Sequence, residues 1–529
     1  MPRLGLGLGL NVGSSSYSSG AGSLMQWTGM GQGMYSTITG KNGGANISTS
    51  SRTRHYSPYA FRKFRIVVPV FETIGTPLLD TLLAGGQTVL YFQFGLEYPF
   101  VEAVTGLAAR IPVTFSGQNY VRYDSSTHDA NFGYLISDVI DAGQWIPAFA
   151  FFGLHSTVEV PAGVVNNVLP YMVNATNFNE RWCAQSFSAT SRIVGNGGLS
   201  DFALASATVT KLGTTQTGVT GVFTPAMMLI ETPLAYKCVV GIGDSLCQGN
   251  NEGQAGSGAF GDAMGSALGN AGWCSRGVFE KALLSFVNLG RGSDGTKFLS
   301  TANNWRYRRQ LMALANPTHI LHENGVNDVS ATITISGWAA TTAYVKYDVR
   351  SANSNFYMCE VAGTSAGAGG PSGTGSAIVD GTVTWSWIGA FPASANPRGW
   401  GQIYAWDVNT HDQIKALLPS VKIIQSTVVP GSTSTDSWAT DANQTVRTGW
   451  GDATTRYGLL NIARRAMLAR LSLSGIIDLG PALEFNSPTQ TGKWVVTGAA
   501  NYATQDGTHH NSKGADLGSE RVVVNSTFV

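Results

Sequence analysis

The stretch from Val239 to Leu246 constrains the fold of this chain more than any other part of its sequence. It reads Val-Val-Gly-Ile-Gly-Asp-Ser-Leu, so an apolar run ends abruptly in small and polar residues. This pattern indicates a buried strand that turns directly into a helix. Because the carboxyl end of a central strand in an α/β sheet faces the crevice where ligands bind, Ser245 is a candidate nucleophile. The tetrapeptide alone is a weak signal, since a serine in Gly-Asp-Ser is usually a helix cap.

The sequence after residue 236 alternates between short apolar runs and longer helical stretches. Such alternation favours a mainly parallel sheet covered by helices, here of the flavodoxin-like α/β/α type. The expected strands are Cys238 to Ile242, Ser285 to Leu289, His319 to Glu323, Val421 to Val428 and Gly475 to Leu479. The expected helices are Gly258 to Leu268, Asn303 to Ala315, Gly401 to Leu418 and Tyr457 to Leu471.

The first half of the chain has a different pattern, in which turn clusters separate short β-type runs. The runs are Phe64 to Val70, Val89 to Phe94, Ile111 to Phe115, Trp145 to Phe151 and Ala207 to Thr210. Short strands at this spacing predict an antiparallel β-sandwich, jelly-roll-like, over residues 53–235. Residues 1–52 are rich in Gly, Ser and Thr and cannot build a core, so they are interpreted as an attachment arm, with a flexible linker as the alternative.

One region interrupts the alternation of the second half. Residues 335–392 show no helical stretch and combine aromatic residues with Gly-, Ser- and Pro-rich runs, which predicts a small all-β insert. The pattern resembles chitin-binding-type modules, in which exposed aromatic faces stack on sugar rings. The alternative, that each ring belongs to the insert's own small core, is about equally favoured. The candidate sugar-binding residues are Trp338, Tyr344, Trp385 and Trp387.

The chain is therefore expected to be a multidomain α+β protein. Its α/β part is divided by the insert into residues 236–334 and 393–529.

Three further motifs bring polar groups to the edge of the sheet where Ser245 is expected. Gly290 follows the second strand, where a residue without a side chain lets its N–H approach a substrate oxygen. Asn327 follows the third strand and supplies an amide donor. Near the end of the chain, Asp506 precedes His509 by three residues, close enough in a turn to orient the imidazole.

Taken in order, these motifs resemble the SGNH hydrolase superfamily, also called the GDSL esterases. The resemblance covers about 236–525 without the insert, and the motifs are specific only in combination. It implies that Ser245 is the nucleophile, His509 the general base and acid, and Asp506 the carboxylate that orients it. It also implies an oxyanion hole formed by the N–H groups of Ser245 and Gly290 and the side chain of Asn327. His510 is expected to face solvent.

The order of sandwich and hydrolase domain also resembles SGNH proteins of tailed phages. In that setting the loop 434–444 is expected over the carboxyl edge of the sheet, where Asp436, Trp438 and Asn443 line the substrate cleft. The alternative is a connection that only precedes the next helix. No cofactor is implied, and no metal site, because the histidines lack carboxylate or thiolate ligands at a recognisable spacing.

Composition excludes several classes of protein. With 33 basic and 32 acidic residues and no basic run, the chain lacks the charge pattern of a nucleic-acid binder. It has no apolar run of about 18 residues, so membrane insertion is not expected. The glycine–leucine alternation after Met1 is not interpreted as a secretion signal. The five cysteines are scattered and are expected to be mostly free and buried.

The function expected from this sequence is hydrolysis of acyl esters, most plausibly O-acetyl groups, on bacterial surface polysaccharide. We expect the protein in a phage tail fibre or spike, or outside the cell, attached to other tail proteins through residues 1–52, with homo-oligomerisation left open. Two alternatives are a receptor-binding or structural virion protein that performs little chemistry, and a bacterial lipolytic esterase. The Gly-, Ser- and Thr-rich loops do not suggest the apolar lid or groove of a lipase.

Overall fold

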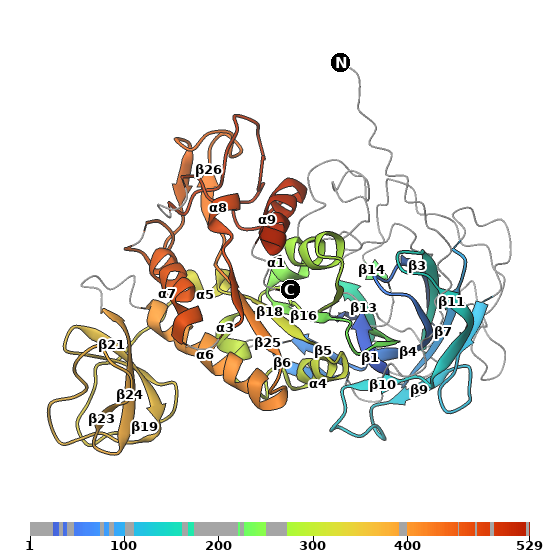
Figure 1. The fold of residues 1–529 in the computed structure, drawn as a ribbon, viewed down its shortest axis with the longest axis horizontal. Coiled ribbons are helices and arrows are strands. Elements are labelled where there is room, and N and C mark those ends of the chain that lie inside the picture. The colour runs from blue at the N-terminus through green and yellow to red at the C-terminus, as the bar shows by residue number, and fades with distance from the viewer. Residues whose placement is uncertain are drawn as a thin grey trace.

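The computed structural model shows a mixed α/β protein in which the strands gather in several sheets (Figure 1). The described residues are 25–30, 35–39, 47–74, 79–83, 89–100, 110–160, 168–173, 221–222, 227–249, 272–390, 399–452, 454–470, 473–486, 491–524 and 528. The predicted strand Ala207 to Thr210, the predicted helix Gly258 to Leu268, Cys183 and most of the arm 1–52 lie outside them.

A five-stranded parallel sheet forms the centre of the second half of the chain. Its strands are β16 (Cys238–Gly243), β17 (Ser285–Asn288), β18 (His319–Glu323), β25 (Lys422–Ser426) and β28 (Gly475–Ile477). They lie in the order β17-β16-β18-β25-β28. This is the 2-1-3-4-5 order of flavodoxin-like sheets, and it reverses beside β16. The five predicted strands are confirmed because each is an apolar run bounded by turn residues.

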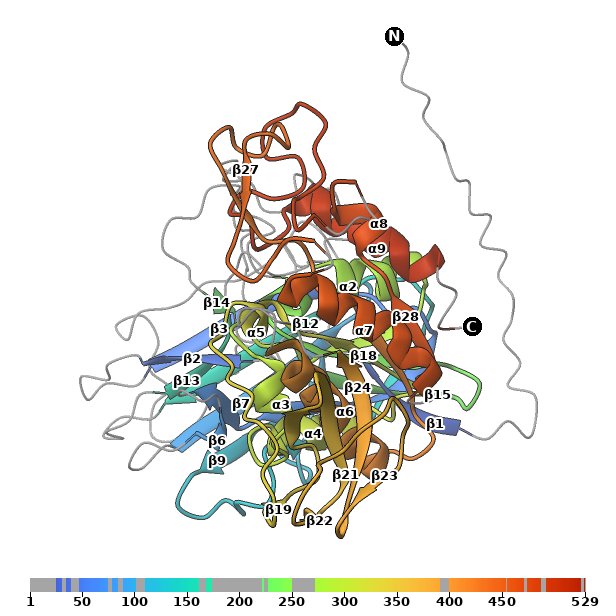
Figure 2. The same ribbon diagram turned by 90° about the vertical axis from the view of Figure 1, so that its left-hand side faces the viewer.

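Helices cover both faces of this sheet. They are α1 (Ser245–Gln248), α2 (Trp273–Ser275), η5 (Arg276–Lys281), α3 (Thr296–Leu299), α4 (Arg306–Leu314), α5 (Val326–Val329), α6 (Trp400–Leu417), α7 (Arg456–Arg470), α8 (Gly480–Leu483) and α9 (Ser512–Val524). Helix α6 packs against α3 and α7, whereas α9 packs against α2, η5 and α8 on the other side of the sheet (Figures 1 and 2). The predictions for α4, α6 and α7 are confirmed. Helix α9 was not predicted, because tertiary packing offsets its weak helical pattern.

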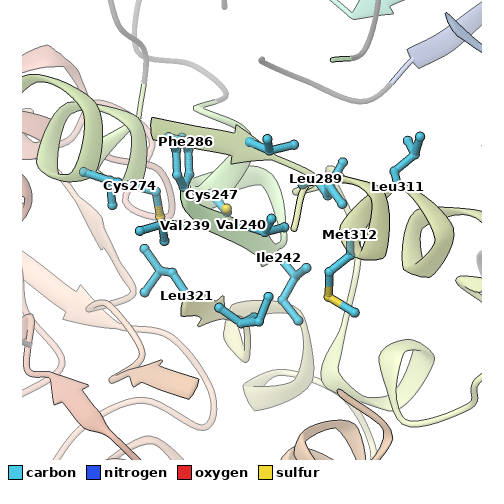
Figure 3. Close-up of a cluster of buried hydrophobic side chains, with 14 of the residues drawn as sticks. Val239, Val240, Ile242, Cys247, Cys274, Phe286, Leu289, Leu311, Met312 and Leu321 are labelled. Carbon is cyan, nitrogen blue, oxygen red and sulfur yellow. The ribbon is translucent and has the colours of Figure 1, made fainter. Parts of the chain in front are cut away.

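The core under β16 is apolar and closely packed. Figure 3 shows Val239 beside Phe286 of β17 and Leu321 of β18, with the Cys247 side chain directed into the same cluster. Each of these side chains is at most 2% exposed. Among the described residues, Cys247 and the other cysteines are free and buried, as expected from their spacing.

The first half of the chain consists mainly of antiparallel sheets. One contains β1 (Met25–Met30), β15 (Met227–Pro233), β4 (Phe61–Pro69), β10 (Tyr134–Ile136) and β11 (Ile140–Ile146). Another contains β3 (Ile47–His55), β12 (Phe152–Val160), β7 (Val89–Glu97), β8 (Arg110–Val113) and β9 (Val121–Asp124). Smaller sheets comprise β2 (Tyr35–Thr39), β13 (Val168–Val173) and β14 (Gly221–Val222), and the hairpin of β5 (Phe71–Ile74) and β6 (Leu79–Leu82).

The antiparallel pairing agrees with the strand pattern of the sequence, whereas the jelly-roll-like sandwich stays a prediction. The predicted strand from Trp145 to Phe151 is wrong. Strand β11 ends at Ile146, and a turn in which Phe149 has a φ of 62° leads into β12. A proline at 147 and a left-handed residue two positions later cannot continue a strand, although both flanking runs are apolar.

The insert folds as a four-stranded antiparallel sheet in the order β20-β21-β24-β23, with a short pair β19-β22. The strands are β19 (Ala343–Tyr344), β20 (Val349–Ala352), β21 (Asn355–Val361), β22 (Gly363–Thr364), β23 (Ile378–Asp380) and β24 (Val383–Ala390). The insert packs on α6. There the rings of Phe356 and Trp400 lie edge to face, with their centroids 5.6 Å apart. In Figure 1 it extends from the end of the α/β region away from α1. No helix among the described residues is long and apolar enough to cross a membrane.

Candidate active site

Ser245 is the first residue of α1, directly after β16. Asp244 caps the helix, and its carboxylate accepts the N–H of Leu246 at 2.9 Å. The turn is tight, because a Cβ at Gly243 would lie 2.1 Å from the Glu323 carbonyl oxygen. Only glycine fits at this position, because the neighbouring strand β18 lies so close to the end of β16. The strand-to-helix turn follows at once. It leaves Ser245 at the carboxyl edge of the sheet with 6% of its surface exposed.

The serine, the histidine and the aspartate expected from the sequence form a continuous chain of hydrogen bonds. Ser245 Oγ lies 2.8 Å from His509 Nε2. His509 Nδ1 lies 2.7 Å from Asp506 Oδ2. The other carboxylate oxygen, Oδ1, accepts the backbone N–H groups of Thr508 at 2.8 Å and His509 at 2.7 Å. This geometry allows His509 to take the serine proton while Asp506 stabilises the imidazolium that forms.

The electrostatics of Asp506 suit that role. Partial burial acts to raise its pKa, but hydrogen bonds from the His509 ring and from two backbone N–H groups outweigh burial and hold the pKa well below its usual value. The carboxylate therefore stays ionised at every pH at which the protein is expected to work.

The turn that carries His509 is held by residues far away in the sequence. Arg447 donates to the Asp506 carbonyl oxygen at 2.6 Å and to the Thr508 hydroxyl. The Gly507 carbonyl oxygen accepts the Trp494 Nε1–H at 3.1 Å, as well as a backbone N–H from the hairpin of β26 (Ser432–Ser434) and β27 (Gln444–Val446). Sequence reasoning missed Arg447 and Trp494, because neither lies in a motif.

Gly507 itself has no room for a side chain. Its φ is +72°, and a Cβ would lie 1.8 Å from the Ser432 carbonyl oxygen. Trp438 was expected to line the cleft, but it packs under this turn. Trp438 is 9% exposed, and a Cβ on Gly507 would lie 2.7 Å from its ring. The Nε1–H of Trp438 donates to Ser432 Oγ at 3.0 Å. The sequence therefore identified a residue near the site but gave it the wrong role.

Asp436 was also expected in the substrate cleft, and its carboxylate is instead used by its own loop. It accepts hydrogen bonds from the hydroxyl of Ser434 at 2.7 Å, the hydroxyl and N–H of Thr440 at 2.6 and 3.0 Å, and the amide of Asn443 at 3.0 Å. Short polar side chains that bond to nearby backbone groups are typical of turns. Asp436 therefore orders the loop that supports the His509 turn.

The three predicted oxyanion donors differ in their partners. Among the described residues, no acceptor lies within hydrogen-bond reach of the Ser245 N–H. Asn327 is exposed on α5 and donates one amide hydrogen to the Asp294 carbonyl oxygen at 2.6 Å, which leaves its second amide hydrogen. The Gly290 N–H is already donated to Asn288 Oδ1 at 2.9 Å. The prediction of a free Gly290 donor is therefore wrong for this structure.

Asn288 is the physical reason for that difference. An asparagine side chain readily accepts the N–H two residues later, and here it also donates to the Cys247 carbonyl oxygen at 2.7 Å. It ties the strand end before Gly290 to the helix that carries Ser245. The Asn-x-Gly spacing was the sequence signal for this turn.

A pair of buried carboxyl groups lies beneath the nucleophile. Glu323 Oε2 accepts the backbone N–H groups of Cys247 at 3.2 Å and Asp244 at 3.4 Å. Burial raises the pKa of Glu323 to about 8 and that of Asp244 well above its usual value. The charge of Glu323 raises the pKa of Asp244 further, whereas hydrogen bonds from Asp244 lower that of Glu323 without outweighing burial. The pair therefore holds a proton at neutral pH. Sequence reasoning missed Glu323, which ends an otherwise ordinary buried strand.

Two other predictions near the site change. His510 is fully buried, and burial lowers its pKa to about 3, so the expectation that it faces solvent is wrong. In the insert, Tyr344 and Trp385 are 3% and 0% exposed and form its core with Tyr357. Their faces cannot stack on a sugar.

The other two candidate sugar-binding residues of the insert, Trp338 and Trp387, are half-buried. Trp338 donates its Nε1–H to Asp380 at 2.7 Å, and Trp387 donates to Asn355 at 2.9 Å. Their partial exposure keeps sugar stacking open for these two rings. Among the described residues no group of three or more His, Cys, Asp or Glu side chains could hold a metal ion.

No family model and no curated protein matches this chain. Similar solved structures include one described as a GDSL-like lipase from Parabacteroides merdae, with 12% identity, 54% of this chain and 94% of that chain covered, and a TM-score of 0.28. A family 3 carbohydrate esterase from Clostridium thermocellum has 10% identity, 55% and 95% coverage and a TM-score of 0.27. An acetyl xylan esterase from Butyrivibrio proteoclasticus has 8% identity, 96% and 95% coverage and a TM-score of 0.28. Scores of this size do not establish a family, so the chemistry rests on the geometry of the site.

Proposed function

We propose that this protein is a serine ester hydrolase of the SGNH type. The observation that supports this most strongly is the chain of hydrogen bonds from Ser245 Oγ through His509 to Asp506, with heavy-atom distances of 2.8 and 2.7 Å. Three side chains in this order and at these distances are the arrangement that activates a serine hydroxyl.

The proposed reaction has two halves. His509 Nε2 takes the hydroxyl proton as Ser245 Oγ attacks the ester carbonyl carbon, and the protonated ring then gives that proton to the leaving alcohol. Water, deprotonated by the same nitrogen, attacks the acyl-enzyme, and the ring returns that proton to Ser245 Oγ as the bond to the acyl group breaks and the acid leaves. The Ser245 N–H and the second amide hydrogen of Asn327 are the donors available to the oxyanion, each worth about 3 kcal/mol of transition-state stabilisation.

We infer that the substrate is an O-acetyl group on bacterial surface polysaccharide. The described side chains around the reacting groups include Asn327, Arg447 and Thr508, which are polar and at least partly exposed. Such surroundings suit a hydroxyl-rich substrate with a short acyl group better than a long fatty-acyl chain.

We further propose that the protein acts in a virion tail or outside the cell. The Gly-, Ser- and Thr-rich residues 1–52 would attach it to other tail proteins, and the support for this comes from the sequence pattern alone. The test is whether purified phage particles contain the protein and lose it when residues 1–52 are deleted.

The test of the activity is hydrolysis of p-nitrophenyl acetate and of acetylated bacterial polysaccharide by wild type and Ser245→Ala. We expect acetate release from both substrates with wild type only. If wild type and variant are equally inert while both bind cells, the receptor-binding alternative replaces the esterase. A strong preference for long acyl chains would favour the lipolytic alternative.

A further inference from the structure

A buried cluster of three charged side chains joins the two halves of the chain. Asp80 belongs to β6 in the N-terminal β region, Arg308 to α4, and Asp294 to the loop after β17. Arg308 Nε lies 3.0 Å from Asp80 Oδ1, and Arg308 Nη1 lies 2.5 Å from Asp294 Oδ2. All three side chains are at most 1% exposed. Charges this deeply buried are tolerated only when they are paired, so the cluster has one favourable geometry.

Asp80 is held firmly on its own side of the cluster. Its carboxylate also accepts the Thr73 hydroxyl at 2.8 Å and the Arg308 backbone N–H at 2.9 Å. The Thr73 carbonyl oxygen accepts the Arg291 guanidinium at 3.3 Å. The hairpin of β5 and β6 is therefore joined to the 291–294 loop in two ways. Arg291 of the loop contacts the hairpin directly, and Arg308 of α4 links Asp80 of the hairpin to Asp294 of the loop.

The same loop holds an oxyanion donor. The backbone carbonyl oxygen of Asp294 accepts one amide hydrogen of Asn327 at 2.6 Å, which fixes the plane of that amide. The carboxylate of Asp328, the next residue, accepts the Thr296 N–H at 2.8 Å. The position of the Asn327 amide thus depends on where the 294–296 segment lies, and Arg308 fixes Asp294 in that segment.

We propose that the β5–β6 hairpin of the N-terminal region positions Asn327 for catalysis through Asp80, Arg308 and Asp294. Asp80 is then a positioning residue for the esterase reaction, although it belongs to the N-terminal β region and not to the α/β region that carries the triad. The inference rests on the proposed function. It deepens that function, because it makes the N-terminal region part of the hydrolytic machinery.

The positioning role predicts a loss in kcat with little change in KM. If the amide of Asn327 is displaced, the transition state loses a donor while the neutral ester is bound about as before. For Asp80→Asn, which keeps the shape and removes the charge, we expect kcat on p-nitrophenyl acetate to fall roughly tenfold and KM to stay within about twofold. Asp141→Asn is the matched control, because Asp141 pairs with Arg62 at 2.8 Å on an exposed surface of the same region. We expect it to leave both constants unchanged.

A double-mutant cycle separates positioning from general support of the fold. In an Asn327→Ala background, Asp80→Asn should lower kcat by less than about twofold, because the group on which it acts is gone. The same tenfold loss in both backgrounds would overturn the proposal, as would an Asp80→Asn variant with normal kcat. All kcat assays are performed at a temperature well below the unfolding temperature of each variant, which is measured by circular dichroism.

A second variant covers the case in which Asp80→Asn does not fold. Thr73→Val removes only the hydroxyl hydrogen bond to Asp80 and keeps all charges; we expect a roughly threefold loss of kcat that likewise disappears in the Asn327→Ala background. An unchanged kcat in Thr73→Val, with Asp80→Asn unfolded, would count against the proposal. Wild type that is inert on every ester would instead overturn the proposed function. An active wild type with uncoupled variants would overturn only this inference.

Discussion

The two sides of the candidate active site are built in different ways. The triad side, Ser245, His509 and Asp506, lies within the α/β region and is supported by the β26–β27 hairpin of that same region. The oxyanion side, comprising Asp294 and Asn327, is held from outside by the N-terminal β5–β6 hairpin. The comparison indicates that proton transfer is a local property of one region, whereas oxyanion stabilisation depends on how two regions pack.

The largest expected effect concerns the triad side. Ser245→Ala and His509→Ala should each lower kcat at least about 10,000-fold, and the double variant should be no worse, because the residues act as a unit. Steady-state hydrolysis of p-nitrophenyl acetate measures this. Additive losses in the double variant would show that the two side chains do not work on the same step.

A smaller effect is expected on the oxyanion side. Asn327→Ala should lower kcat about 100-fold and leave KM nearly unchanged, because one preorganised donor is lost in the transition state. Asn131→Ala provides a control, since that amide donates to Asp129 at 2.9 Å on an exposed surface of the N-terminal region. If Asn327→Ala keeps full kcat, the oxyanion relies on other donors, and the contrast between the two sides disappears.

The support of the triad side can be tested at a glycine. Gly507→Ala should lower kcat roughly tenfold and stability by about 3 kcal/mol, because the new Cβ would collide with the Ser432 carbonyl oxygen and φ is positive. Gly498→Ala is the matched control: φ there is +86°, but nothing lies within 4 Å of the added Cβ. We expect Gly498→Ala to lower the free energy of unfolding by about 1 kcal/mol and to leave kcat unchanged. Chemical unfolding and kcat together check both variants, and equal effects at the two glycines would contradict the crowded turn.

The smallest expected effect on kcat concerns the carboxyl pair beneath the nucleophile, which is expected to act on stability. The folded protein holds the Glu323 proton up to a pKa of about 8, whereas the unfolded chain loses it near the usual glutamate value of 4.5. Stability should therefore fall as pH rises through this window and level off above it. In Glu323→Gln the amide stays neutral, its oxygen can accept the same two N–H groups, and the fall should be shallower.

Denaturant unfolding of wild type and Glu323→Gln at pH 5 and pH 8 measures this difference. Glu520→Gln, at a side chain that is 62% exposed and pairs with Lys281 on the surface, is the control and should follow wild type. An identical pH dependence in wild type and Glu323→Gln would show that Glu323 is not the group responsible.

Much of the α/β region could be predicted because its signals are local. The strands β16, β17, β18, β25 and β28 are apolar runs between turn residues, and burial of such a run does not depend on its partner. The spacing of Asp506 and His509 likewise fits within one turn. The prediction of a strand from Trp145 to Phe151 was wrong. The turn between β11 and β12 lies among apolar residues, so the local pattern did not reveal it.

The sequence by itself determined the order of the elements in the α/β region and the residues that meet at its catalytic edge, since both follow from periodicity and short-range turn chemistry. Only the tertiary structure decided which groups are free to act. It buries Trp385 in the insert, places Trp438 under the His509 turn and connects Asp80 to the oxyanion loop. Each of these depends on which segments pack together and which polar groups lose water there, and no local pattern encodes that.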